Sequence, residues 1–553
     1  MKSISFKNFR RFSDFPEFKF GNITILVGGN NAGKSTLVKA LLLVLDNLKT
    51  MRRDIDSNLF DSLFMPEFRF DENTFHELNI KNFSRALNRL CLNEDHITFK
   101  ICLEEHFSND IYEFEIVVSK YNKKGVVFDS NEDPRGFIDF ISVNNISKGI
   151  QFDFSFSNWN GEAPYMYVRI VDDTAKEIES KIDSLKQEKS ELTQHIKDAE
   201  LRLKEASAFD SQIIDKLNDH KFSLKKIDKI LSDTLKDKEK AKDVEAKIPF
   251  SPSLDILSKY LLVDLIRDII NYAGYPSTHK KGSKAYNSEI KIKDILKKYS
   301  PKMKECSDGI RNLLDSIDVD YIQAHGVTQK TLFLTSDNSD HIAKTIKEFV
   351  QSHASQNEDI RKFIRRWMSI FRIGYDFSIK SEEGEAYKVY IRELPDNEDG
   401  YPLADLGMGS IQLMMLLFAL ATSIKNNYGV VFEKRTVIIE EPEQNLHPML
   451  QSRLADLLYE INQTYGLNFI VETHSEYLIR RTQVLVAEMN LSEEELEKQN
   501  PFKVYYFPEE GLPYDMKYTT SGRFDNSFGE GFFDEASSSA LTISRIERRR
   551  KNG

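Results

Sequence analysis

Nine residues near the start of the sequence have the types and the spacing of a loop that holds phosphate groups. They are Gly28-Gly29-Asn30-Asn31-Ala32-Gly33-Lys34-Ser35-Thr36, between a β-branched run at 23–27 and an apolar run at 36–48 typical of a helix. The glycines let successive backbone N–H groups turn inward, and the helix N-terminus adds partial positive charge. We expect Lys34 to reach the β- and γ-phosphates of ATP and the Ser35 hydroxyl to bind Mg²⁺.

Two adjacent carboxylates follow a second buried run, at 436–439. Glu440 and Glu441 would be poorly solvated at the end of an apolar strand and would repel each other. A nearby Mg²⁺ relieves that repulsion, so we expect Glu440 to hold the metal through a water molecule. Glu441 is then placed to orient and deprotonate the water that attacks the γ-phosphate.

Two further segments complete the set of residues that could act on a triphosphate. His474 follows the apolar run 469–471, and its imidazole could contact the γ-phosphate or position the water. Gly407, Gly409 and Ser410 precede the apolar run 413–424, where small residues at a helix N-terminus form a second anion site. Arg10 and Arg11 stand upstream of the phosphate loop and are candidate contacts to nucleotide phosphates.

The elements that must position these residues lie at the two ends of a chain of 553 residues. Residues 1–172 read as a lobe with the phosphate loop and a β-rich part from 96 onward, and 376–510 as a second lobe. Between them, 173–247 is rich in charge and free of Pro and Gly, with apolar residues in a heptad pattern at Ile178, Ile182, Leu185, Leu192, Ile196, Ala199, Leu203, Ile213, Leu217, Leu224, Ile227 and Leu231. Two antiparallel helices in a coiled coil explain this pattern, with one long surface helix as the alternative. We expect 248–375 to be mainly helical and 511–553 to be an irregular tail that docks a partner.

Composition narrows the class of protein. A net charge of -11 argues against a surface that coats nucleic acid indiscriminately. Three cysteines without a C-x-x-C pair make a disulfide framework and a cysteine zinc site improbable, which fits a reducing cytoplasm. No N-terminal signal region is evident, and the apolar run 413–421 is too short to span a bilayer. We expect a cytoplasmic protein without a membrane partner.

The order of these motifs resembles that of the SMC-like and OLD-type ABC ATPases. The run Glu440-Glu441-Pro442-Glu443-Gln444-Asn445-Leu446-His447-Pro448 is similar to their EEPE-x-x-LHP segment, with Glu440 where many ABC proteins have aspartate. The resemblance implies an α/β fold: an ABC-type ATPase head, split into N- and C-terminal lobes, with an inserted antiparallel coiled-coil hairpin and helical region. It implies ATP hydrolysis between two copies of the chain, where Gly407, Gly409 and Ser410 would contact the nucleotide of the opposite subunit. The glutamine that senses the metal in this class is not evident, and Gln151, Gln323 and Gln329 are candidates.

Two shorter segments, 321–330 and 531–535, resemble the PtuA family, the ATPase subunits of Septu-type and retron-associated antiviral systems. That likeness implies a homodimer or higher homo-oligomer that controls a separate HNH nuclease of the PtuB kind, because the 79 residues after His474 are too few for the nuclease domain of OLD-type proteins. Nucleic acid and a retron reverse transcriptase complex are further candidate partners. An AriA-like antiviral ATPase, a DNA-repair ATPase of the RecF or SMC-like kind, and a scaffold that binds ATP without turnover stay open as alternatives.

Overall fold

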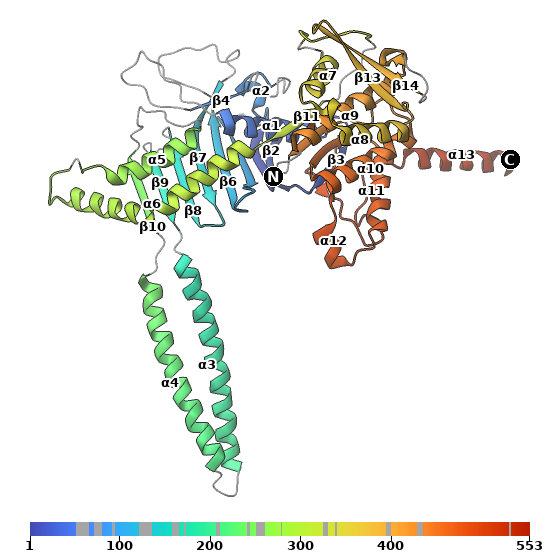
Figure 1. The fold of residues 1–553 in the computed structure, drawn as a ribbon. Helices are drawn as coiled ribbons and strands as arrows, with labels where there is room; N and C mark the ends of the chain where they lie inside the picture. Colours follow the sequence, from blue (N-terminus) through green and yellow to red (C-terminus); the bar gives the residue numbers. More distant parts are fainter. Residues whose placement is uncertain are drawn as a thin grey trace.

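The motif-bearing segments from both ends of the chain meet in one parallel β-sheet (Figure 1). The computed structural model describes residues 1–50, 66–70, 80–90, 95–120, 135–156, 165–170, 173–205, 211–240, 244–249, 260–277, 279–323, 330–337, 340–393, 400–427, 435–529 and 532–552. The described strands form three sheets, and two hydrophobic cores lie against them. The fold is therefore mixed α/β.

The first sheet is antiparallel and contains the β-rich part of the N-terminal region. Its strands run in the order β10-β9-β8-β7-β6-β5-β1-β2, with β4 paired to β7. Their bounds are β1 Ser3–Phe9, β2 Phe12–Lys19, β4 Glu67–Arg69, β5 His96–Glu104, β6 Ile111–Ser119, β7 Arg135–Asn145, β8 Ile150–Ser155, β9 Tyr165–Ile170 and β10 Val244–Pro249. Burial alternates along β5 because one face of the sheet packs on the core. The core also contains α1 (Lys34–Thr50), α2 (Phe83–Ala86), α5 (Leu261–Gly274) and α6 (Lys284–Ser316).

The second sheet carries the phosphate loop and both acidic segments. Its order is β11-β16-β17-β3-β18-β19, and every neighbouring pair from β11 to β18 is parallel. The bounds are β3 Ile23–Gly28, β11 Val319–Ile322, β16 Thr436–Glu440, β17 Asn468–Thr473, β18 Phe502–Phe507 and β19 Tyr514–Asp515. Along β3, Ile23, Ile25 and Val27 enter one core while Leu26 enters the other. Both faces are thus buried, as in parallel sheets covered by helices.

The helices of the C-terminal half pack with the second core. They are α7 His341–Gln351, α8 Glu358–Ile370, α9 Met408–Asn427, α10 Pro448–Tyr465, α11 Glu476–Glu488 and α12 Glu493–Gln499. A third, small sheet consists of β12 Phe333–Leu334, β13 Asp376–Glu382, β14 Ala386–Arg392 and β15 Tyr401–Pro402. Among the described helices, α9 is long and apolar enough to cross a membrane, but most of it is buried in the core, which accounts for its composition.

The heptad-patterned region forms two long helices, α3 (Asp173–Glu205) and α4 (Ser211–Lys240), which project together from the first sheet (Figure 1). Ile182 and Ile196 on α3 and Ile227 on α4 are buried, although the rest of these helices is largely exposed. Ion pairs join the two helices, Lys189 to Asp228 at 2.8 Å and Glu200 to Lys221 at 2.7 Å. The predicted turn near residue 207 lies outside the described residues, and supercoiling of the pair stays a prediction.

Helices predominate in the described part of 248–375, although α5 and α6 pack on the first sheet, α7 and α8 belong to the second core, and β11 lies between them. One expectation about the chain differs from the structure. The end of the chain is not irregular throughout, because 535–552 form α13 (Glu535–Asn552). This segment contains neither Pro nor Gly, and its acidic first turn and basic end suit the helix dipole.

Candidate functional site

The phosphate loop closes tightly between β3 and α1. Asn31 and Gly33 both have left-handed backbone conformations, with φ of 59° and 107°. A Cβ atom at Gly33 would lie 2.5 Å from the Phe12 ring, so glycine is required there for space as well as for φ. The N–H of Thr36 donates to the Gly33 carbonyl at 3.0 Å, which starts α1 directly beneath the loop. The predicted strand–loop–helix geometry is therefore present.

Lys34 lies at the centre of this loop and is almost fully buried. Its Nζ atom donates to the carbonyls of Gly28 and Gly29, both at 2.9 Å, and lies 3.3 Å from Nε2 of His474. Burial lowers the pKa of Lys34, and the charge of Glu472 opposes that effect. Lysine held inside its own loop in this way can exchange carbonyl partners for phosphate oxygens.

The parallel register brings the ends of β16 and β17 beside the phosphate loop. Glu440 pairs with Glu472, and Thr473 pairs with Val27. Beyond the strands, Nε2 of His474 lies 3.6 Å from a carboxylate oxygen of Glu441. Burial, and then the charge of Lys34, lower the pKa of His474, which favours the neutral imidazole. Lys34, His474 and Glu441 thus form a connected line.

The backbone at Glu441 holds its side chain in place. Its φ of 43° is unusual for a residue other than glycine, and conformations of this kind cluster at functional sites. The Gln444 amide donates to the Glu441 carboxylate at 2.5 Å. The carboxylate of the adjacent Glu443 accepts the His474 backbone N–H at 2.6 Å. The segment after β16 therefore fixes both the predicted base and the histidine.

Glu472 is a site residue to which the sequence analysis assigned no role. Its carboxylate accepts the Ser35 hydroxyl at 2.9 Å and 3.1 Å and lies 3.8 Å from Nζ of Lys34. Burial raises its pKa to about 7, with Lys34 opposing and the nearby Glu440 adding to the rise. The signal that could have found it is the order of the strands, since β17 is the direct neighbour of β3.

A cavity of about 610 Å³ opens over the phosphate loop and is strongly cationic. Arg10 and Arg11 line it together with residues 31–36 and Glu472, so the structure brings these predicted residues together. Three cations that sequence reasoning did not select also line it, Lys39, Arg85 and Arg89. Burial and the neighbouring Arg85 lower the pKa of Arg10. Arg11 donates to the backbone carbonyls of Asn31 and Glu509 and so ties the loop to the segment after β18.

The structure does not bring the Gly407–Ser410 element to this cavity. The element forms the start of α9, where the Ser410 N–H donates to the Gly407 carbonyl at 2.9 Å. A Cβ atom at Gly409 would lie 2.6 Å from the carbonyl oxygen of Asn445, so this glycine lets α9 contact the loop after β16. Gln151 is also absent from the cavity lining, because it lies on β8 and bonds Asp153 at 3.0 Å. Gln329 lies outside the described residues.

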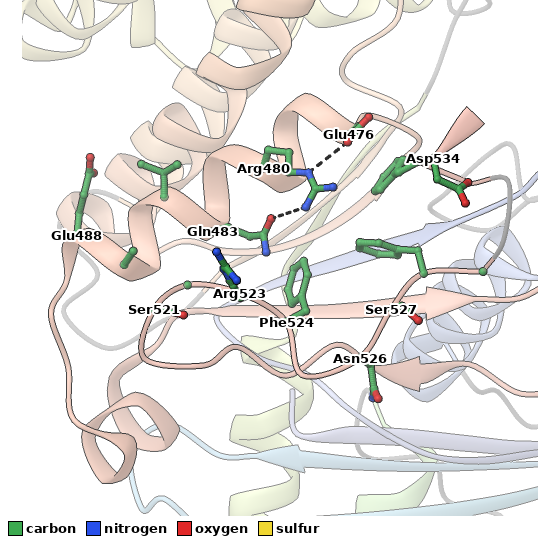
Figure 2. A pocket seen from close by; sticks show the side chains of 16 residues that line it. Glu476, Arg480, Gln483, Glu488, Ser521, Arg523, Phe524, Asn526, Ser527 and Asp534 are labelled. Atoms are coloured by element: carbon green, nitrogen blue, oxygen red, sulfur yellow. Dashed lines mark hydrogen bonds and ion pairs between the residues drawn. The ribbon is translucent and has the colours of Figure 1, made fainter. Parts of the chain in front are cut away.

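A larger cavity, about 1010 Å³, lies between α11 and residues 521–529 and 533–534 (Figure 2). On the α11 side Arg480 donates to Glu476 and Gln483, and on the other side Phe524 and Asn526 contribute to the lining. No phosphate-loop residue lines it. The smaller, cationic cavity is therefore the candidate nucleotide site.

The donor set of that cavity fits ATP and Mg²⁺. Lysine and arginine side chains and a helix N-terminus suit phosphate oxygens. The Ser35 hydroxyl and the nearby carboxylates are hard oxygen donors of the kind that Mg²⁺ takes beside substrate phosphates. The cavity volume lies in the usual range for small-molecule sites, about 300–1,000 Å³.

Comparison with known proteins gives one family match. A family model described as an AAA ATPase domain matches residues 1–479. No curated protein matches the chain. Among solved structures, the chain is similar to the Smc head domain with an extended coiled coil, bound to the C-terminal domain of ScpA, from Pyrococcus furiosus, at 11% identity over 99% of both chains and a TM-score of 0.30. A second Smc head, bound to the C-winged helix domain of ScpA, has 11% identity, 93% and 97% coverage and a TM-score of 0.28. Likenesses of this size carry no argument about function.

Proposed function

This chain belongs to the AAA ATPase domain family, and from that premise we propose that it binds ATP with Mg²⁺ in the phosphate-loop cavity and hydrolyses it. The observation that supports the proposal most is the position of His474 between Lys34 and Glu441. Its Nε2 atom lies 3.3 Å from Nζ of Lys34 and 3.6 Å from a carboxylate oxygen of Glu441. The site thus places a cation that can bind phosphate next to an imidazole that can hydrogen-bond, and the imidazole next to a carboxylate that can act as a base. Such an order suits attack of water on a terminal phosphate.

Each residue then has a distinct role. Lys34 and the N-terminus of α1 would hold the β- and γ-phosphates, with Arg10 and Arg11 on the outer side of the cavity. Ser35 and the carboxylates at the ends of β16 and β17 would hold Mg²⁺, which supplies charge neutralisation of the phosphates when bound. Glu441, fixed by Gln444, accepts the proton of the attacking water. His474, neutral because of burial and Lys34, donates toward the γ-phosphate.

We propose further that hydrolysis takes place between two copies of the chain. Gly407, Gly409 and Ser410 stand at the exposed start of α9 and do not line the cavity of their own copy. The place of Gly409 beside Asn445, in the loop that follows the base, supports a role of this element at the nucleotide of a second copy. A homodimer, or a higher assembly of dimers, would complete both sites.

The biological role that the sequence supports best is control of a separate effector in antiviral defence. The support is the resemblance of segments 321–330 and 531–535 to PtuA proteins, which act with an HNH nuclease. The alternatives are an AriA-like antiviral ATPase and a DNA-repair ATPase of the SMC or RecF kind. We place this activity in the cytoplasm, with nucleic acid or a reverse transcriptase complex as additional candidate partners.

Affinity purification from the native host tests this role. The tagged wild-type chain and a variant lacking residues 525–551 are each captured in ATP and in nucleotide-free buffer, and partners are identified by mass spectrometry. We expect an HNH nuclease with the wild type and none with the truncated chain, although both bind ATP. Recovery of chromosome-structure or repair proteins instead would favour the DNA-repair alternative.

A further inference from the structure

The hydroxyl that must face the metal in the proposed site is held by one carboxylate, and that carboxylate is Glu472. Both oxygens of Glu472 accept from Ser35 Oγ, at 2.9 Å and 3.1 Å. Its side chain is only 7% exposed, so little water reaches it. A buried carboxylate that straddles one hydroxyl has lone pairs to spare for a cation placed between the two groups.

Glu440, which the sequence predicts to hold the metal through a water molecule, is hydrogen-bonded on its far side. Its Oε1 accepts the hydroxyl of Tyr321 at 2.6 Å, and Tyr321 lies on β11. Because the strand order is β11-β16-β17-β3, this bond lies on the side of β16 away from the phosphate loop. Adjacent strands are about 4.8 Å apart, so β16 is roughly 10 Å from β3 while β17 is its direct neighbour.

We infer that Glu472, with Ser35, binds the Mg²⁺ of the nucleotide directly, and that Glu440 acts on it from one shell further out. The inference rests on the proposed ATPase function and adds to it the identity of the direct carboxylate ligand. Lys34 Nζ lies 3.8 Å from Glu472, so Ser35 and Glu472 would hold the cation close to the lysine that contacts the phosphates. Metal and lysine would then meet neighbouring oxygens of the same phosphates.

A measurement of metal affinity distinguishes the roles proposed for Glu472 and Glu440. Binding of Mn²⁺ is measured by electron paramagnetic resonance in the presence of a non-hydrolysable ATP analogue, for the wild type, Glu472→Gln and Glu440→Gln. We expect Glu472→Gln to weaken Mn²⁺ binding by 100-fold or more and Glu440→Gln by about tenfold, the effect of an outer group. Glu476→Gln, a carboxylate on α11 paired with Arg480, is the matched control and should bind Mn²⁺ like the wild type.

Nucleotide affinity measured without metal shows whether a change in Mn²⁺ binding comes from the metal site or from the nucleotide site. With EDTA present, Glu472→Gln should bind the analogue at least as well as the wild type, because a repelling charge has been removed. Wild-type Mn²⁺ affinity in Glu472→Gln, or a larger loss in Glu440→Gln, would overturn the inference. A second outcome would also overturn it: Glu472→Gln binds the nucleotide more tightly than the wild type, and by the same factor with Mg²⁺ and with EDTA. Glu472 would then only occupy the Ser35 hydroxyl and would not bind the metal. Glu472→Asp, which keeps the charge, should recover part of the Mn²⁺ affinity if the glutamine variant unfolds.

A wild-type chain that binds no nucleotide in either buffer would instead refute the proposed function itself.

Discussion

Among single residues, Lys34 has the most contacts with the other groups of the site. It lies within 4 Å of two loop carbonyls, of His474 and of Glu472, and it is buried. A charge in this position is costly unless anions surround it, and apart from Glu472 the other charged residues that line the cavity are cations. A polyanionic ligand would satisfy Lys34 and its cationic neighbours together.

Removing the Lys34 charge is therefore predicted to abolish nucleotide binding. Lys34→Ala should weaken the binding of a fluorescent ATP analogue by about 100-fold or more, or roughly 3 kcal/mol. Lys19→Ala, an exposed lysine on β2, serves as the control. A folded Lys34→Ala protein with unchanged affinity would show that the loop does not hold the phosphates.

Some site residues could be predicted from their neighbours in the sequence, and others could not. Gly33 and Lys34 belong to a pattern of nine consecutive residues, and Glu441 follows an apolar run, so neighbours in the chain reveal them. Glu472 and Arg85 become part of the site only through strand order and through the packing of α2 near the loop. Their roles, like those of Glu441 and His474, stay predictions until they are measured.

Among the elements, α9 joins the core to the predicted contact with a second copy. Its apolar side chains are buried, while its first turn is open, with Met408 42% exposed. We predict that Ser410→Arg prevents ATP-dependent pairing, because the added cation fills the space that the other copy's γ-phosphate must enter. Light scattering with ATP should show monomers, and ATP turnover should fall to background.

Nucleotide binding to the separate copies should survive that substitution, since Ser410 is not part of the cavity of its own copy. Ser369→Arg on the exposed side of α8 adds the same charge elsewhere and should pair normally. Normal hydrolysis by Ser410→Arg would contradict a site shared between two copies.

One buried carboxylate links the small third sheet to α8 through ion pairs. Asp376 on β13 accepts from Arg361 and Arg365 of α8 and from Arg392 of β14, at 3.2, 2.9 and 2.6 Å. Burial alone would raise the pKa of Asp376, but the bonds from Arg365 and the Phe377 N–H, with the charge of Arg361, lower it overall. A lowered pKa means that this carboxylate stabilises the fold above its ordinary titration range, and that the stabilisation is lost as the pH falls through the lowered folded-state value.

Asp376→Asn is accordingly predicted to destabilise the chain by about 3–5 kcal/mol, because three half-buried arginines lose their shared, buried anion. Thermal unfolding at pH 7 measures the loss. The difference between variant and wild type should shrink as the pH falls below about 4, where Asp376 of the unfolded chain takes up a proton, and should vanish once the pH has passed the lowered folded-state pKa. A difference independent of pH would show that the carboxylate charge is not the cause.

Elements with strong local patterns could be predicted from the sequence, and elements defined by distant partners could not. The strand ending at Gly28, the helix after Lys34 and the long pair α3 and α4 follow from periodicity and turn residues. The strand β11 has four residues, all partly exposed, and its identity depends on pairing with β16 more than 100 residues away. The helix α13 was missed because its serines and arginines resemble a solvated tail.

On the scale of the whole molecule, an ATPase core carries projections that reach away from its nucleotide site. The long helices α3 and α4 project from the first sheet, and α13 extends from the C-terminal part of the fold with Leu541, Ile543 and Ile546 exposed (Figure 1). Both projections stay candidate docking elements for the proposed partner.

We predict that the chain alone cleaves no nucleic acid. Glu440 and Glu441, the carboxylate pair identified in the sequence, are assigned here to ATP. Purified protein incubated with DNA or RNA and Mg²⁺ or Mn²⁺ should leave the substrates intact, with added HNH nuclease as the positive control. Robust cleavage that disappears in an Asp534 variant or in a Glu440/Glu441 double variant would place a nuclease within the chain.

The most direct test of the central claim is Glu441→Gln, measured for ATP turnover and for mass in solution in the same preparation. The amide keeps the shape of the side chain and loses the base, so turnover should fall by about 100- to 10,000-fold. The variant should still bind ATP and should accumulate as an ATP-bound dimer or an assembly of dimers. Turnover at the wild-type rate, or an ATP-saturated variant that stays monomeric, would contradict hydrolysis by Glu441 between two copies of this chain.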